Sequence, residues 1–104
     1  MTKKLSYPTP GEILLHEFLL PMGLSQYRLA KEINVPQQRI GEIVSGKRSV
    51  SADTGLRLSR FFGLNDQFWT GLQLDFDMAT AKASMSKVLN NIVTFTYREQ
   101  LETA

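Results

Sequence analysis

The sequence predicts an all-α fold, and three observations support this fold class. Apolar residues recur at spacings of three and four along most of the chain, as they do on the buried face of a helix. Thr or Ser stands before several of these segments, where it can cap a helix, and Gly or Asn follows them. With 104 residues, 42% of them hydrophobic, the chain can form one domain with a modest core. We expect five helices at about residues 10–20, 26–33, 36–45, 52–62 and 66–83.

The first predicted helix, at about residues 10–20, begins with a capping box. Thr9 can cap it, Pro10 suits the first helical position, and Glu12 stands three residues after the cap. Pro21 lacks a backbone N–H and Gly23 follows it, so we expect the helix to stop before these two residues.

Residues 25–46 predict two short helices joined by a tight turn, the arrangement called a helix-turn-helix. Such a pair needs a small residue where the helices touch, and Ala30 supplies it. Four residues later, Asn34 tolerates the left-handed backbone that the turn requires. Ser25 caps the second helix, and Gly46 ends the third. The apolar residues that can hold the pair together are Leu29, Ile33, Val35, Ile40 and Ile43.

The fourth predicted helix, at about residues 52–62, is capped by Ser51 and ends at Gly63. Its apolar residues are Leu56, Leu58, Phe61 and Phe62.

The fifth predicted helix, at about residues 66–83, carries large apolar side chains at helical spacing. Such residues must be buried, either in the core of the chain or against a second copy of it. A platform for stacking nucleic-acid bases is the weaker alternative. Because two recognition helices about 34 Å apart meet successive major grooves on one face of DNA, we expect a homodimer built on the last two helices and the segment after them. The candidate interface residues are Phe68, Trp69, Leu72 and Phe76.

The C-terminal extension, residues 84–104, carries two patterns. Met85, Val88, Leu89 and Ile92 suit a helix. We expect the helical chain to continue to about residue 92 and leave the conformation of the remainder open. A strand is the alternative there, because Val93, Phe95 and Tyr97 alternate with Thr94, Thr96 and Arg98. The predicted division is therefore a DNA-binding domain at 1–83 and an extension at 84–104.

The third predicted helix presents residue types that read DNA bases on its outward face. Gln bonds adenine through two atoms, Arg bonds guanine through two atoms, and Glu accepts from cytosine. Ser25 and Gln26 begin the second helix, where backbone N–H groups favour a phosphate. Lys47 and Arg48 follow the third helix and suit the flanking phosphates. The predicted base-contacting residues are Gln37, Gln38, Arg39 and Glu42.

The charge distribution agrees with a polyanionic partner at this place. Residues 24–63 contain seven Lys or Arg against three Asp or Glu, although the whole chain has a net charge of only +2. A basic surface favours DNA because neutralised phosphates release counterions. Taken alone, the charges fit an ordinary solvated surface equally well, and short helices with polar faces are common in bundles. The tight turn, the apolar residues that join the two helices and the basic residues around them together favour double-stranded DNA as the partner.

Residues 25–62 resemble the lambda-repressor-like helix-turn-helix domain of the xenobiotic-response-element type. The resemblance implies a five-helix bundle in which Gln26 touches phosphate and braces Gln37, which reads a base. Asn34 departs mildly from the family, in which Gly is commoner at that position. Further positions that match DNA-contacting residues of the family are Gln38, Arg39 and Ser45.

Several separated motifs follow one another over nearly ninety residues: PGEIL at 10–14, PMGLSQ at 21–26, IVSGKR at 43–48, SADTGLRL at 51–58 and FWTGLQLDFD at 68–77. In this order they resemble the HigA antitoxin family, also called virulence-associated protein I. The resemblance implies a homodimeric antitoxin that binds a palindromic operator in its own promoter and neutralises a HigB-type toxin, an mRNA-cleaving ribonuclease. A stand-alone transcriptional regulator and a purely protein-binding helical module are the alternatives.

The residues predict no catalysis, metal or cofactor. The chain has no cysteine and a single histidine, His16, so it offers no metal-ligand cluster. Asp75 and Asp77 are two apart on a predicted helix and make a poor general acid–base pair. The N-terminus lacks the apolar run of a signal peptide, and no apolar stretch is long enough to cross a membrane, so we expect a cytoplasmic protein.

Overall fold

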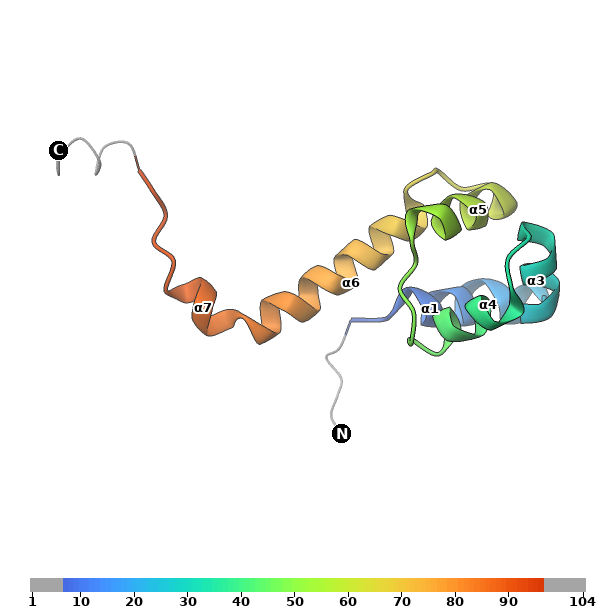
Figure 1. The fold of residues 1–104 in the computed structure, drawn as a ribbon, viewed down its shortest axis with the longest axis horizontal. Helices are drawn as coiled ribbons and strands as arrows, with labels where there is room; N and C mark the ends of the chain where they lie inside the picture. The colour runs from blue at the N-terminus through green and yellow to red at the C-terminus, as the bar shows by residue number, and fades with distance from the viewer. Residues whose placement is uncertain (1–6, 97–104) are drawn as a thin grey trace.

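The computed structural model describes residues 7–96, and all the secondary structure in that range is helical, which confirms the predicted all-α class. The helices form a globular part from which the C-terminal helices project (Figure 1). In chain order the elements are α1 (Pro10–Ile13), η1 (Leu14–Leu19), α2 (Leu20–Met22), α3 (Gln26–Ile33), α4 (Gln37–Val44), α5 (Ala52–Phe62), α6 (Phe68–Ser84) and α7 (Ser86–Asn90).

The first three elements form one continuous helix that begins as predicted and ends later. The Glu12 backbone N–H donates to Thr9 Oγ1 at 3.1 Å, and the Thr9 N–H donates to Glu12 Oε1 at 3.0 Å, so the capping box is present. The helix runs through Pro21 and ends at Gly23, which has a left-handed φ of 62°. Its middle, η1, is a wider π-helical stretch. A regular α-helix would drive the ring of Pro21 into the carbonyl four residues back, and a widened turn before the proline fits this constraint.

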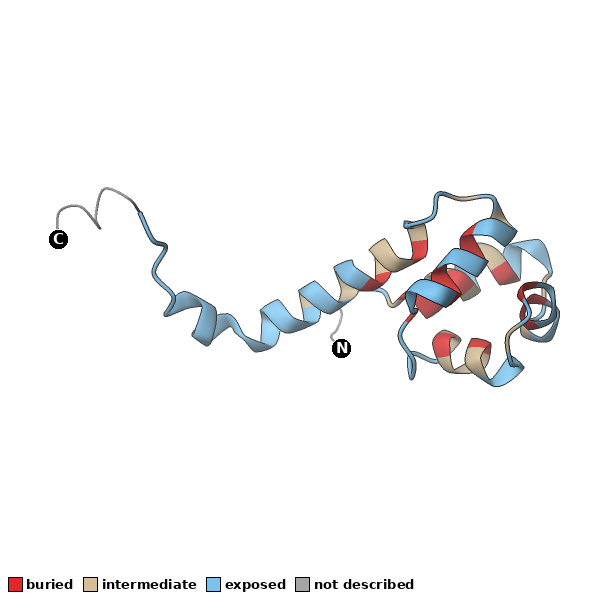
Figure 2. Ribbon diagram, turned by 45° about the horizontal axis from the view of Figure 1, so that its top comes forward, coloured by how far each residue is buried: buried red, intermediate tan, exposed pale blue. Residues whose placement is uncertain are grey.

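The core lies where α1, η1, α3, α4, α5 and the first turns of α6 meet (Figure 2). Trp69 is its largest member and is 0% exposed. The ring of Phe18 packs 5.0 Å from that of Trp69 and 4.8 Å from that of Phe62, measured between ring centroids. The other buried apolar residues are Leu14, Leu19, Leu29, Ala30, Ile33, Ile40, Ile43, Val50 and Leu58.

The start of α1 lies directly against the end of α4. Gly11 is buried, and a Cβ atom built on it would stand 1.8 Å from the carbonyl oxygen of Ile43. Only a residue without a side chain allows this approach, so Gly11 sets the distance between α1 and α4.

Helix α6 begins in the core and then leaves it, as the change from buried to exposed residues along the helix shows (Figure 2). The chain measures 63 × 35 × 21 Å along its principal axes because α6 and α7 project from the globular part. The predicted helix to about residue 92 is interrupted at Met85, whose φ of −107° and ψ of 13° separate α6 from α7. Residues 92–96 form no strand, and positions 97 and 98 of the alternative strand prediction lie outside the described residues.

In the described range, none of the helices combines the length and the apolar composition that crossing a membrane would take.

Candidate nucleic-acid interface

Helices α3 and α4 form the predicted helix-turn-helix. Asn34 follows α3 with φ 62° and ψ 53°, the left-handed conformation that was expected for it. The Val35 N–H donates to the Ala30 carbonyl at 3.0 Å, which closes the turn, and the Ala30 side chain is buried. Ser25 Oγ accepts from the Arg28 N–H at 3.0 Å and caps α3. The predicted roles of these residues in the local fold are therefore confirmed.

The outward face of α4 holds the four residues predicted to contact bases. Gln37 and Gln38 are exposed, whereas Arg39 and Glu42 are half-buried. No side chain caps the start of α4, because the residue in front of it is Pro36. The first turn of α4 therefore presents the exposed side chains of Gln37 and Gln38 beside backbone N–H groups that no side chain caps.

Glu42 is engaged within the chain by both of its carboxylate oxygens. Its Oε1 accepts from Arg48 Nε at 2.7 Å, and its Oε2 accepts from Gln38 Nε2 at 3.0 Å. These two hydrogen bonds, with Arg48 the stronger cause, hold the pKa of Glu42 below its usual value. Glu42 therefore holds the side chains of Gln38 and Arg48 in place, and its contact with cytosine stays a prediction.

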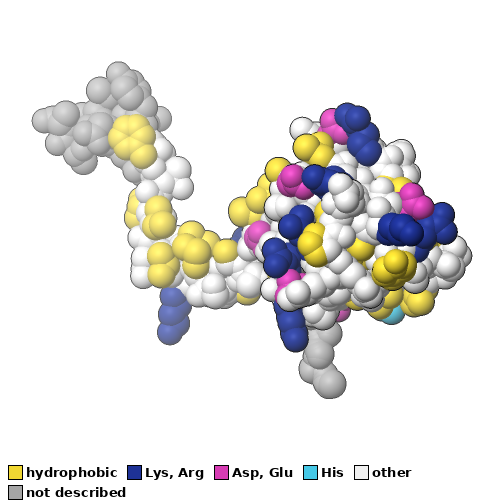
Figure 3. Space-filling model, turned by 45° about the vertical axis from the view of Figure 1, so that its right-hand side comes forward, with side chains coloured by type: hydrophobic (Ala, Val, Ile, Leu, Met, Phe, Trp, Pro, Cys, Tyr) yellow, Lys and Arg dark blue, Asp and Glu magenta, His cyan; other side chains and the backbone are white. Residues whose placement is uncertain are grey.

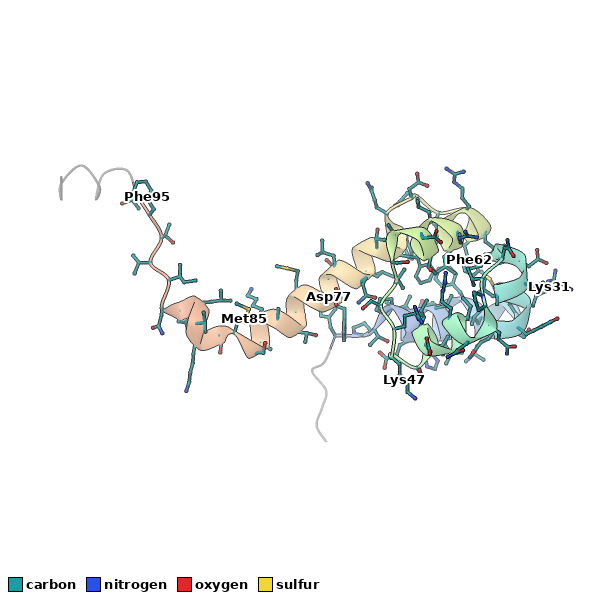
Figure 4. The ribbon with its side chains drawn as sticks, in the orientation of Figure 1. Lys31, Lys47, Phe62, Asp77, Met85 and Phe95 are labelled. Atoms are coloured by element: carbon teal, nitrogen blue, oxygen red, sulfur yellow. The ribbon has the colours of Figure 1, made fainter. Side chains whose placement is uncertain are left out.

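The backbone carbonyl of Glu42 also holds the loop after α4 in place. The Glu42 carbonyl accepts from the N–H of Lys47 at 2.8 Å and from that of Arg48 at 3.2 Å, and Ser45 Oγ donates to it at 3.2 Å. Lys47, in the first half of this loop, points away from the globular part (Figure 4). In the described part of the chain Lys47 forms no salt bridge, so its charge is available to a partner.

Gln26 is the first residue of α3, and its half-buried side chain faces α4. Its Oε1 is 3.6 Å from the point where a Cβ of Gly41 would stand. The resemblance implied that Gln26 braces Gln37, but in this structure the two side chains do not form that hydrogen bond, and Gln26 meets the middle of α4 instead.

Two residues that hold this surface in place could not be identified from the sequence. The first is Arg57 on α5, whose Nη1 donates to the carbonyl of Ile33 at 2.9 Å and to that of Asn34 at 3.3 Å. Arg57 Nε also donates to Asp53 at 2.6 Å, which holds the guanidinium in place. Arg57 was predicted only as one of the basic residues of the middle segment, whereas it ties the turn between α3 and α4 to α5.

The second of these residues is Gln73 on α6, a buried polar residue. Its Oε1 accepts from the Val50 backbone N–H at 2.8 Å, and its Nε2 donates to Asp77 at 3.0 Å. Through this bond α6 fixes the end of the loop that carries Lys47 and Arg48.

Replacing Gln73 with leucine is expected to lower the free energy of unfolding by about 1–3 kcal/mol, because the buried N–H of Val50 loses its acceptor. Urea unfolding of the Gln73→Leu variant measures this. An unchanged unfolding midpoint would show that water or another group satisfies Val50, and that α6 does not hold the loop.

The structure separates the four residues predicted for a dimer interface. Trp69 is 0% exposed within its own chain and therefore cannot contact a second copy, which corrects that prediction. Phe68 and Leu72 are half-buried and pack against the core, while Phe76 is half-buried beside the loop after α4. These four side chains are buried or half-buried because the first turns of α6 lie inside the bundle.

The basic residues of the globular part are interspersed with acidic ones (Figure 3). Three arginines form salt bridges at 2.6–2.7 Å: Arg28 with Glu32, Arg48 with Glu42, and Arg57 with Asp53. Across residues 7–96, no three metal-binding side chains gather in one place.

Comparisons with known proteins place these features in a family. A helix-turn-helix family model matches residues 15–69. Virulence-associated protein I of Dichelobacter nodosus is 46% identical over 79 residues, which cover 76% of this chain and 73% of that protein. The solved structure of Pseudomonas aeruginosa antitoxin HigA with the higBA promoter superposes with a TM-score of 0.82 at 36% identity, over 86% of this chain and 99% of that one. Antitoxin GraA in complex with its operator gives a TM-score of 0.81 at 31% identity, over 92% and 98%.

Proposed function

Because the chain belongs to the HigA-type branch of the helix-turn-helix family, we propose that it is a sequence-specific DNA-binding antitoxin, which represses its own operon and neutralises an mRNA-cleaving toxin of the HigB type. The observation that carries the DNA-binding part is the face of α4. Gln37 and Gln38 are exposed there beside Arg39, and the loop with Lys47 and Arg48 is fixed next to them. Related antitoxins solved with a promoter or an operator share this fold.

The proposed interface divides into reading and clamping residues. Gln37, Gln38 and Arg39 lie on the exposed side of α4 and reach base edges in the major groove. Glu42 holds Gln38 and Arg48 by hydrogen bonds and so sets their positions before DNA arrives. The residues that contact phosphates are Ser25, Gln26, Ser45, Lys47 and Arg48.

A reporter gene behind the DNA upstream of this gene tests the repressor function in cells. We expect expression of the chain to lower the reporter signal, and the variant Gln37→Ala to restore it. A signal that the wild-type chain leaves unchanged, with or without the toxin, contradicts autorepression.

We propose further that the chain is a homodimer and that α6 and α7 form the interface. Between residues 74 and 96, eight large apolar side chains are exposed, and so much exposed apolar surface is typical of an interaction site. Leu74, Met78, Ala81 and Met85 follow one another at spacings of four, three and four, the pattern by which two helices pack along a seam. A groove of about 380 Å³ lies on this side, lined by Met78, Ala81, Lys82, Met85 and Leu89.

Replacing Met78 with glutamate is expected to convert the dimer into a monomer at micromolar concentration, because it places a charge in the middle of the apolar seam. Light scattering coupled to gel filtration measures the mass. Thr80→Glu is the matched control, since Thr80 is exposed on the same helix but points away from Met78. If Met78→Glu stays dimeric, the interface lies elsewhere.

A further inference from the structure

A groove lies between the N-terminal helix and the start of α6. Its volume is about 600 Å³, and its apolar wall is formed by Ile13, Phe68 and Leu72. Glu12, His16 and Glu17 line it as exposed polar residues, and Pro8 also lines it. We name this feature the acidic groove.

Within residues 7–96, the charge of the acidic groove is not neutralised by a lysine or an arginine. Neither Glu12 nor Glu17 belongs to a salt bridge among the described residues. The sequence explains this, because residues 7–27 and 61–81, the described segments that include the two walls, contain no Lys or Arg. The cations of the globular part gather instead on α3, α4, α5 and the loop after α4.

We propose that the acidic groove is the docking site for the toxin, through a basic toxin surface with an apolar side chain that enters the groove. This inference rests on the proposed function. A protein that binds and cleaves mRNA meets a polyanion and so presents Lys and Arg. Such a surface complements a groove with an apolar wall and two carboxylates that form no salt bridge with the described residues. A second copy of this chain fits less well, because its own basic surface is the one that binds DNA.

The position of the acidic groove leaves the DNA interface free. Gly11 faces α4, and Ile13 stands two residues later, about 200° further around the helix. No residue of α4 or of the loop after it lines the groove. The toxin and the operator therefore bind opposite sides of the first helix, and we expect one chain to hold both at once.

The test compares toxin binding of the full chain and of the double variant Glu12→Gln/Glu17→Gln, with the purified toxin of the same operon as the probe. Glutamine at position 12 keeps the capping box, so the helix start is preserved. We expect the Kd for the toxin to rise about tenfold or more, while operator affinity stays within about twofold because neither residue is placed at the DNA.

Glu32→Gln is the matched control. Glu32 is an exposed carboxylate that lines a second groove of similar volume, about 560 Å³, formed with Leu56, Arg57 and Phe61. We expect this variant to bind the toxin as the wild-type chain does. A gel shift of the operator with the chain, followed by added toxin, should give a slower-migrating complex rather than release of DNA.

Three results overturn the proposal in distinguishable ways. If the double variant binds the toxin as tightly as the wild-type chain, the docking site is elsewhere and the proposed function stands. If Glu32→Gln weakens binding equally, charge alone and not the acidic groove is responsible. If the wild-type chain binds its operator but not the toxin, toxin neutralisation fails and this inference fails with it.

Discussion

Replacing Gly11 with alanine is expected to lower the free energy of unfolding by about 3 kcal/mol. The added methyl group would stand 1.8 Å from the Ile43 carbonyl oxygen and 2.7 Å from its carbonyl carbon. Both atoms belong to the backbone of α4, so no side-chain rotation relieves the contact. Helix α4 must move away from α1, and with it the side chains proposed to read DNA. Urea unfolding measures the stability, and operator titration measures the displacement.

Gly71→Ala is the control for this substitution. A Cβ on Gly71 meets nothing within 4 Å, although Gly71 also lies in a helix. Alanine there is expected to raise stability by about 0.5–1 kcal/mol, through the lower backbone entropy of the unfolded chain. If Gly11→Ala unfolds at the same urea concentration as the wild-type chain, α1 and α4 are not packed as described.

The double substitution Gln37→Ala/Arg39→Ala is expected to lower operator affinity by about 2–6 kcal/mol, because each good bidentate base contact contributes about 1–3 kcal/mol. Binding to unrelated DNA should change much less, since it depends mainly on phosphate contacts. The ratio of the two affinities is therefore the decisive quantity. Fluorescence anisotropy with operator and scrambled duplexes at one fixed salt concentration measures it.

The variant Lys47→Ala distinguishes a phosphate contact from a base contact. Lys47 is exposed and forms no salt bridge with the described residues, so its loss should weaken binding to all sequences equally. The salt dependence of log Kd should fall by about one ion. A loss confined to the operator would instead place Lys47 among the base-reading residues.

The local structure of this chain was predictable where one residue type satisfies the backbone at one position, as a capping residue or a left-handed turn residue does. Thr9 with Glu12, Ser25 and Ser51 mark helix starts, and Asn34 marks the turn, because each satisfies backbone groups next to it in the sequence. The surface of α4 followed from the same local reasoning, since the apolar residues Ile40 and Ile43 fix which side faces outward.

Features that depend on distant contacts were not predictable. Pro21 remains inside a helix because the preceding turn widens, and composition does not encode that adjustment. Gln73 and Arg57 resemble surface residues in the sequence, yet each bonds to backbone groups more than twenty residues away. The aromatic residues of the fifth predicted helix were ambiguous between core and interface, and only the direction of α6 shows that Trp69 is core and that the exposed seam begins near Leu74.

Recognition of a specific operator by the face of α4 can be measured by a gel-shift titration of the chain against its own upstream DNA. The titration uses about 100 mM salt, a concentration at which nonspecific phosphate contacts are already weakened, and an excess of competitor DNA. We expect a discrete shift that resists the competitor and that Gln37→Ala abolishes. A shift that the competitor removes, or one that Gln37→Ala leaves intact, would contradict it.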